Sequence, residues 1–233
     1  MYKFLFIDLD DTVLDFKKAE ERALRSTLMD AGIEPNRQVC RRYSEINQSY
    51  WQRLERGEIT RQQVLTGRFE SLFKELGCDA DPDYSSEAYM SYLSQGHDFL
   101  PGAEEALAVL CQRYTLYLAS NGTASVQRQR LKSANISRYF AEIFISQDIG
   151  VNKPDREFFT RCFERIPGFD PAAAMIVGDS LTSDILGGQN AGIATCWINP
   201  EHKPCTLQRQ PDYQLERLDQ LPTLLEGKIP CCP

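Results

Sequence analysis

Apolar and polar residues follow two different patterns along this chain. Between residues 16 and 95, aliphatic and charged residues recur at helical spacing, and no segment there has the character of a strand. Two of these segments stop at a glycine, Gly32 or Gly77, which commonly ends a helix, and Thr60 is a suitable cap for the start of another. We therefore predict helices at residues 17–31, 38–56, 61–76 and 85–94.

From residue 101 onward, short apolar runs alternate with helical patterns. The predicted strands are residues 115–119, 143–146, 174–177, 194–198 and 213–215. The predicted helices are residues 103–112, 125–133, 155–164, 183–190 and 218–225. Strands that alternate with helices are typical of βαβ units, so this half of the chain predicts a parallel sheet.

One more apolar run, Phe-Leu-Phe-Ile at residues 4–7, reads as a strand buried on both faces. It is separated from the other strands by the helical region, which is far longer than an ordinary loop. We therefore predict an α/β fold with two domains. Residues 1–15 and 100–233 form a parallel-sheet core, and residues 16–99 form an inserted all-helical domain.

The composition adds mainly exclusions. The chain has 233 residues, of which 42% are hydrophobic and 25% charged, as in an ordinary globular protein. Its net charge of −7 argues against binding to a nucleic acid polymer but permits one small phosphate beside a metal ion. We expect no membrane span and no signal peptide, since the apolar runs are short. Eight cysteines without a CxxC pair indicate a reduced, cytoplasmic protein, with Cys231 and Cys232 in a mobile tail.

Polar residues follow the predicted strands at points where parallel strands share one edge of a sheet. Each group falls at or soon after the end of a different strand. The groups are Asp8 with Asp10, Ser120 with Asn121 and Gly122, Lys153, and Gly178-Asp179 with Asp184. Each pattern alone is also typical of a turn or a helix cap. Their joint occurrence at successive strand ends predicts one shared site.

This inventory suits phosphoryl transfer through an aspartyl-phosphate. Asp8 is the candidate nucleophile, and Asp10 is the candidate general acid and base. Mg²⁺ prefers oxygen ligands, which Asp8, Asp179 and the backbone carbonyl of Asp10 would supply. Lys153, the Ser120 hydroxyl and the backbone N–H groups of Asn121 and Gly122 would hold phosphate oxygens. Asp184 is expected to orient Lys153 or a metal-bound water.

These motifs resemble those of the haloacid dehalogenase superfamily. Its DxDx[TV] motif is similar to residues 8–12, its Ser/Thr and Lys motifs to Ser120 and Lys153, and its GDxxxxD motif to residues 178–184. The resemblance implies a Rossmann-like core, a helical cap of the C1 type, Mg²⁺ dependence and an aspartyl-phosphate intermediate. The second acid, Asp10, favours a phosphatase over a dehalogenase, and it leaves a phosphomutase open.

The helical insertion is similar to that of bacterial pyrimidine nucleotide 5′-nucleotidases, at residues 46–51, 57–60 and 67–71. That resemblance implies a nucleoside monophosphate such as UMP, dUMP or dTMP as substrate. We expect a monomer or homodimer. Phe16, Trp51 and Arg68 are the candidate substrate-binding residues there, although Trp51 and Arg68 also fit a packing role. A phosphatase for another small metabolite, such as a sugar phosphate or phosphoglycolate, is the alternative.

Overall fold

The computed structural model describes residues 1–227, so the predicted tail at Cys231 and Cys232 lies outside the described residues. The chain forms two compact units. The first, here called the sheet domain, comprises Met1–Asp15 and the chain from His97 onward. The second, here called the helical domain, comprises Phe16–Gly96.

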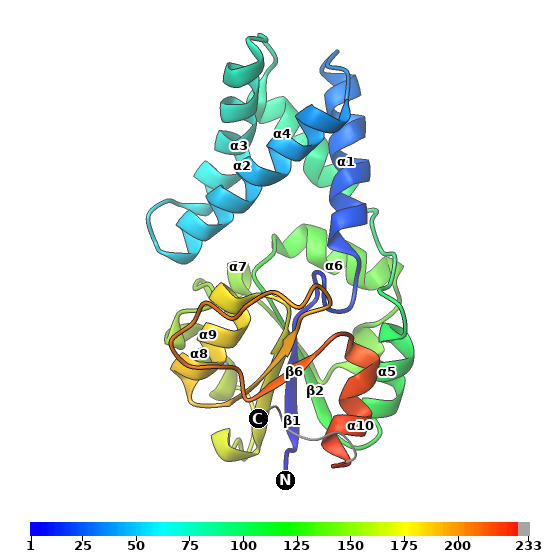
Figure 1. Ribbon diagram of the computed structural model, residues 1–233, viewed down its shortest axis with the longest axis vertical. Helices are drawn as coiled ribbons and strands as arrows, with labels where there is room; N and C mark the ends of the chain where they lie inside the picture. The colour runs from blue at the N-terminus through cyan, green and yellow to red at the C-terminus, as the bar shows by residue number, and fades with distance from the viewer. Residues whose placement is uncertain (228–233) are drawn as a thin grey trace. The chain divides into compact units, whose positions relative to one another are not determined.

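The sheet domain is built on a six-stranded sheet in the order β3-β2-β1-β4-β5-β6, and every neighbouring pair is parallel (Figure 1). The strands are β1 (Phe4–Ile7), β2 (Thr115–Ser120), β3 (Glu142–Ile145), β4 (Ala174–Gly178), β5 (Ala194–Ile198) and β6 (Tyr213–Leu215). The predicted parallel sheet is therefore confirmed. Ser146 was predicted as a strand residue, but it begins a short helix instead.

Side chains of β1 alternate between two hydrophobic layers, which explains its continuous apolar sequence. Leu5 and Ile7 pack on one face with residues of α5 (Ala103–Leu110), α6 (Ala124–Ser133) and α10 (Leu221–Leu225), while Phe6 packs on the other with residues of α8 (Arg156–Phe163). Figure 1 shows α8 and α9 (Leu186–Ala191) on one side of the sheet and α5 and α10 on the other. The sheet domain is thus a three-layer α/β structure, as the sequence predicted.

Most helices of the sheet domain connect successive strands along the chain, and α10 follows β6. The helices are α5 (Ala103–Leu110), α6 (Ala124–Ser133), α7 (Ser146–Ile149), α8 (Arg156–Phe163), α9 (Leu186–Ala191) and α10 (Leu221–Leu225). Short 3₁₀ segments lie at Ser137–Tyr139, Pro171–Ala173 and Leu218–Gln220. The single helix predicted at residues 183–190 is wrong in detail, because a π-helical turn at Leu181–Ile185 precedes α9.

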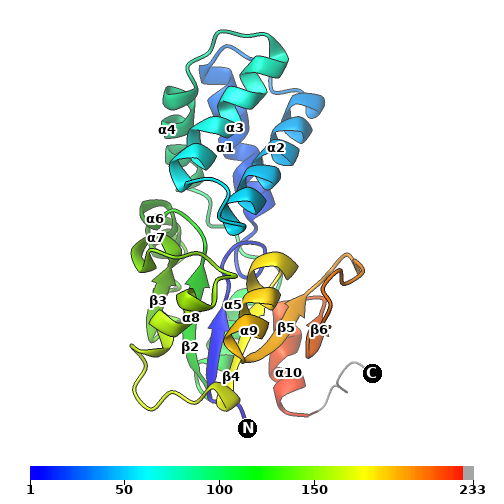
Figure 2. The ribbon, with the colours of Figure 1, turned by 90° about the vertical axis from the view of Figure 1, so that its left-hand side faces the viewer.

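The helical domain contains α1 (Phe16–Asp30), α2 (Arg37–Glu55), α3 (Arg61–Leu76) and α4 (Pro82–Leu93), which Figure 2 shows from a second side. Thr60 forms a capping box with Gln63 at the start of α3, and Gly77 ends that helix in the left-handed conformation. Tyr43, Phe69 and Tyr89 form a buried aromatic cluster that joins α2, α3 and α4. In the part of the chain that the structure describes, no helix is both long and apolar enough to cross a membrane.

Backbone contacts attach residues 98–100 to the sheet domain. Leu14 forms an antiparallel bridge with Phe99, Leu100 N–H donates to the Val13 carbonyl, and Asp15 N–H donates to the Asp98 carbonyl. The second boundary between the two compact units accordingly lies before these residues, at 96–97.

Candidate active site

Three polar residues stand at the carboxyl ends of three adjacent strands. Asp8 directly follows β1, which lies at the centre of the three, Ser120 is the last residue of β2, and Asp179 follows β4. The Asp8 N–H donates to the Val177 carbonyl at 2.9 Å, which holds the start of the loop against β4. Ligands of open α/β sheets bind at this edge, where the strand order turns outward in both directions.

A tight turn after Asp8 places Asp10 close to the same edge. The Leu9 carbonyl accepts from the N–H groups of Val13 and Leu14 at 3.0 and 2.9 Å. Asp11 within the turn has φ 54°, a left-handed conformation that aspartate tolerates better than most residues. The local sequence therefore returns the chain to the sheet with the two carboxylates of Asp8 and Asp10 at one strand end.

Lys153 is the positive centre of the site. Its ammonium donates to Asp8 Oδ1 at 2.8 Å, to Asp184 Oδ1 at 2.6 Å and to the Ala119 carbonyl at 2.5 Å. These three acceptors use all three N–H donors of a lysine, and the residue is only 1% exposed. Burial opposes the charged form, but the carboxylates of Asp184 and Asp8 outweigh it and raise the pKa of Lys153. Lys153 is thus held as a fixed cation beside Asp8.

The Asn121 side chain braces the loop that carries Lys153. Its amide nitrogen donates to the Lys153 carbonyl at 2.8 Å, and its amide oxygen accepts from the Lys153 N–H at 2.9 Å. The peptide bond that follows, Lys153–Pro154, is cis. These contacts join the loop after β2 to the loop between α7 and α8, so the Asn121 side chain acts on the site through the position of Lys153.

Asp184 and the loop after β4 fit closely together. Asp184 Oδ2 accepts from the Ser180 N–H at 3.1 Å, and the Trp197 indole donates to the Asp179 carbonyl at 2.8 Å. A Cβ atom on Gly178 would overlap the Asp184 carboxylate, so only glycine permits this approach. The Gly-Asp motif therefore places two carboxylates near Asp8, one from the strand end and one from the following helical turn.

The carboxylates of Asp8, Asp179 and Asp184 fit a divalent cation. One oxygen of each lies within 4.8 Å of the others. Burial raises the pKa of Asp8 to about 8, although Lys153 opposes the shift, and burial and neighbouring acids raise the pKa of Asp179. The site thus has three acids and one ammonium, so it is short of positive charge. The carboxylate oxygens are the ligands that Mg²⁺ prefers. The sequence assigned Asp8 and Asp179 to the metal; the structure adds Asp184 to the possible ligands.

Asp10 is held by two residues that the sequence analysis did not identify. Arg130 forms an ion pair with Asp10 Oδ1, and the Gln127 amide donates to Asp10 Oδ2 at 2.6 Å. The same amide donates to Ser120 Oγ at 2.9 Å. Gln127 and Arg130 are three residues apart on α6, directly after the Ser120 loop, and this helical spacing at a motif was the only available signal.

The Ser120 hydroxyl accepts two hydrogen bonds, one from Gln127 and one from the Gly122 N–H at 3.2 Å. Since both use its oxygen as acceptor, its own hydrogen can point toward a phosphate oxygen. The Gly122 N–H, predicted to bind phosphate, donates to Ser120 in this structure. Its predicted phosphate contact stays a prediction.

The three predicted substrate-binding residues of the helical domain differ in exposure. Phe16 begins α1 and Trp51 lies on α2; both are half-buried. The Arg61 guanidinium lies 5.5 Å from the centre of the Trp51 ring. Arg68 is only 2% exposed, donates to Asn47 Oδ1 at 2.9 Å and lies 4.5 Å from the centre of the Tyr89 ring. These contacts favour the packing role for Arg68.

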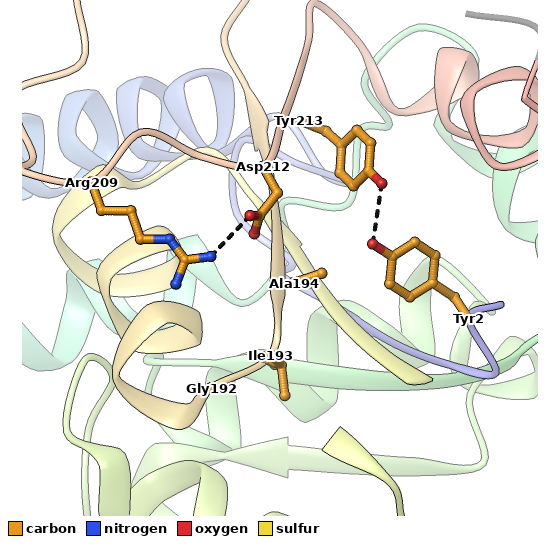
Figure 3. A pocket seen from close by; sticks show the side chains of 7 residues that line it. All are labelled: Tyr2, Gly192, Ile193, Ala194, Arg209, Asp212 and Tyr213. Carbon is orange, nitrogen blue, oxygen red and sulfur yellow. Dashed lines mark hydrogen bonds and ion pairs between the residues drawn. The ribbon is translucent and has the colours of Figure 1, made fainter. Parts of the chain in front are cut away.

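A separate surface pocket of about 440 Å³ lies at the opposite ends of the strands (Figure 3). It is lined by Tyr2, Gly192, Ile193, Ala194, Arg209, Asp212 and Tyr213. These residues lie before β1 or near the starts of β5 and β6, whereas Asp8 follows the end of β1. Arg209 is paired with Asp212 at 2.9 Å, and the hydroxyls of Tyr2 and Tyr213 are 3.2 Å apart. The pocket therefore shares no residue with the carboxylate site.

Comparison with known proteins identifies the family. The chain is 40% identical to the HAD-hydrolase YfnB of Bacillus subtilis over 99% of both chains. It is 38% identical to the pyrimidine 5′-nucleotidase PynA of Streptococcus pneumoniae, over 98% of this chain and 97% of PynA. It is 30% identical to the pyrimidine 5′-nucleotidase YjjG of Escherichia coli, over 96% of this chain and 98% of YjjG.

The fold agrees with the sequence comparison. A crystal structure of YfnB bound to magnesium matches with a TM-score of 0.92, over 96% of this chain and 98% of that one. The family model of haloacid dehalogenase-like hydrolases matches residues 2–192, which include all the strand-end motifs. The chain belongs to the haloacid dehalogenase-like hydrolases, and it is an enzyme of that family.

Proposed function

We propose that this enzyme hydrolyses phosphomonoesters through an aspartyl-phosphate on Asp8. The observation that carries the proposal is the contact of the Asp8 carboxylate with Lys153, with a second acid, Asp10, on the same turn. A carboxylate held beside a fixed cation suits attack on an anionic phosphate, since the ammonium offsets part of the repulsion.

The reaction takes two displacements at phosphorus. In the first, an Asp8 oxygen forms a bond to phosphorus, the bond to the ester oxygen breaks, and Asp10 donates a proton to the departing alcohol. In the second, Asp10 accepts a proton from water as the water oxygen attacks phosphorus, and the bond to Asp8 breaks. Asp8 is regenerated, and inorganic phosphate leaves.

Mg²⁺ is the cofactor of this proposal. Asp8, Asp179 and Asp184 are the side chains that would hold it, and the Asp10 carbonyl remains the predicted backbone ligand. When bound, it would supply the positive charge that the three acids lack and stabilise charge on the phosphate. The Ser120 hydroxyl would donate to a phosphate oxygen, since its own oxygen accepts from Gln127 and Gly122.

The proposed substrate is a pyrimidine nucleoside 5′-monophosphate. The names of PynA and YjjG support this choice, because both relatives are similar to this chain over nearly their whole length. The half-buried Trp51 is a candidate ring for stacking on the base, and Phe16 is a second candidate. A cytoplasmic location and a monomer or homodimer stay predictions.

A panel of phosphomonoesters tests the substrate. UMP, dTMP, AMP, a sugar phosphate and phosphoglycolate are compared by kcat/KM at the same Mg²⁺ concentration. We expect the two pyrimidine nucleotides to exceed the others by about tenfold or more, equal to about 1.4 kcal/mol of discrimination. A tenfold preference for a sugar phosphate would overturn the proposed substrate but not the proposed aspartyl-phosphate mechanism.

The chemistry has its own tests. Asp8→Asn is expected to abolish hydrolysis of every ester while the folded circular dichroism spectrum is retained. EDTA is expected to silence the wild-type enzyme, and Mg²⁺ to restore it. Near-normal turnover by Asp8→Asn would exclude Asp8 as nucleophile, and full activity in EDTA would exclude the metal.

A further inference from the structure

Both oxygens of the Asp10 carboxylate are bound by side chains of α6. Arg130 contacts Oδ1, and the Gln127 amide nitrogen lies 2.6 Å from Oδ2. Asp10 itself is partly exposed, with 28% of its side chain accessible, whereas the Arg130 side chain is 0% exposed. A partly exposed acid is thus anchored by a buried cation.

The orientation of the Gln127 amide is fixed by its neighbours. Its oxygen accepts from Arg130 Nη1 at 2.9 Å, so its NH₂ group must face the other way. That group donates to Asp10 Oδ2 and to Ser120 Oγ, at 2.6 and 2.9 Å. One amide therefore links the proposed acid–base residue to the hydroxyl proposed to hold the phosphate.

Gly122 makes room for this arrangement. A Cβ atom at that position would come within 2.5 Å of Gln127 Cδ and closer still to its amide nitrogen. Any larger residue would push the amide away from Asp10 and Ser120. The glycine of the Ser-Asn-Gly motif thus protects the Gln127 contact, which is a packing role in addition to any backbone contact with phosphate.

We propose that Gln127 and Arg130 are positioning residues that hold the Asp10 carboxyl at the leaving oxygen of a phosphate bound by Ser120. The proposal rests on the proposed phosphatase function. General acid catalysis requires the acid within hydrogen-bond reach of the departing oxygen. That oxygen is bonded to the phosphorus of the phosphate that Ser120 binds. Holding Asp10 at a fixed position relative to Ser120 therefore holds Asp10 at a fixed position relative to the breaking bond. Each Asp10 oxygen has a second lone pair, which leaves a place for the transferred proton.

Comparing two esters with different leaving groups distinguishes a loss of acid positioning from a general loss of activity. The 5′-oxygen of a nucleotide needs a proton to depart, whereas p-nitrophenolate departs without one. The parameter kcat/KM reports the steps up to release of the alcohol, so it excludes the later attack of water. We expect Gln127→Met to lower kcat/KM for UMP about 100-fold and for p-nitrophenyl phosphate less than about 5-fold.

Matched controls lie on the same helix. Gln129→Met and Arg128→Met change exposed residues of the same types, and both should leave the two kcat/KM values within about twofold of wild type. Gly122→Ala should reproduce the selective loss, because it displaces Gln127. Arg130→Lys should retain more activity on UMP than Arg130→Met. If Arg130→Met does not fold, Gln127→Met and Gly122→Ala still decide the question.

A double mutant adds an independent readout. In an Asp10→Ala background there is no carboxyl left to position, so Gln127→Met should lower kcat/KM for UMP no more than it lowers kcat/KM for p-nitrophenyl phosphate. If Gln127→Met lowers kcat/KM for the two esters by the same factor, the positioning role is overturned. Hydrolysis of both esters by the wild-type enzyme would still support the proposed function. A wild-type enzyme that hydrolyses neither ester would overturn both proposals.

Discussion

Replacing the proposed nucleophile should stabilise the metal-free protein while it removes activity. Asp8 lies among Asp179, Asp184 and a single ammonium, and it is only 7% exposed. Burial and the neighbouring acids raise the pKa of Asp8 to about 8, so the folded state disfavours its charge near neutral pH. Asn has nearly the same shape and no charge, and its amide oxygen can still accept from Lys153. Asp8→Asn therefore removes the electrostatic penalty and retains the packing.

The sign and size of the change in the free energy of unfolding follow from proton linkage. Between about pH 4 and pH 8 the unfolded chain has released the Asp8 proton while the folded chain retains it, so the free energy of unfolding falls as pH rises. The full shift to about 8 corresponds to at most about 5 kcal/mol at the upper end of this window. Relaxation and water entry reduce such penalties in real proteins, so we expect Asp8→Asn to gain about 2 kcal/mol near pH 8.

Urea denaturation in EDTA measures this gain. Wild type and variant are unfolded near pH 8 and again near pH 5, with circular dichroism as the probe and the slopes against urea compared. The advantage of Asp8→Asn should shrink at the lower pH, because the wild-type carboxyl is then protonated in the fold. Asp79→Asn, which neutralises an exposed acid of the helical domain, serves as the control and should change little.

Two results would refute this reasoning. A variant less stable than wild type in EDTA near pH 8 would show that the Lys153 contact outweighs burial of the charge. A gain of the same size near both pH values would show that the effect does not come from the Asp8 proton. Either result would also weaken the argument that these carboxylates need a cation.

Two further predictions concern Lys153 and Trp197, which contact this cluster, and a third concerns Arg68 of the helical domain. Lys153→Met should lower the free energy of unfolding in EDTA by about 3–5 kcal/mol near pH 8 and by less near pH 5, measured by urea denaturation, because it leaves buried acids without their cation. Trp197→Phe removes the donor to the Asp179 carbonyl and should weaken Mg²⁺ binding about tenfold in calorimetric titration; unchanged affinity would contradict the role of that bond. Arg68→Met should lower stability by about 2–4 kcal/mol and leave the KM for UMP within about twofold, whereas a large rise in KM would restore Arg68 as a substrate ligand.

The strands and the residues at their ends were predictable because one physical rule governs both. A parallel sheet covered on both faces demands continuous apolar runs, and β1 shows such a run directly before Asp8. The same topology brings the ends of β2, β1 and β4 together. Ser120, Asp8 and Asp179 can therefore be assigned to one edge without knowing any distance.

The irregular segments were not predictable from the same rule. The helix expected at residues 183–190 begins with a π-helical turn, which brings the Asp184 carboxylate against Gly178. Hydrophobic spacing cannot show this, because a single widened turn shifts side-chain directions without changing composition. Ser146 was likewise assigned to a strand, since nothing in its own side chain separates a strand end from a helix start.

The buried polar residues show where pattern reading fails most clearly. Gln127 and Arg130 read as solvent-facing positions of a polar helix, because amphipathic analysis places polar side chains outward. In the structure both are buried, and their partner is a carboxylate more than a hundred residues away in sequence. Arg68 reads like Arg130 in sequence and is equally buried, yet its contacts are Asn47 and aromatic rings. Only the three-dimensional neighbours separate an arginine that holds an acid of the site from one that holds helices together.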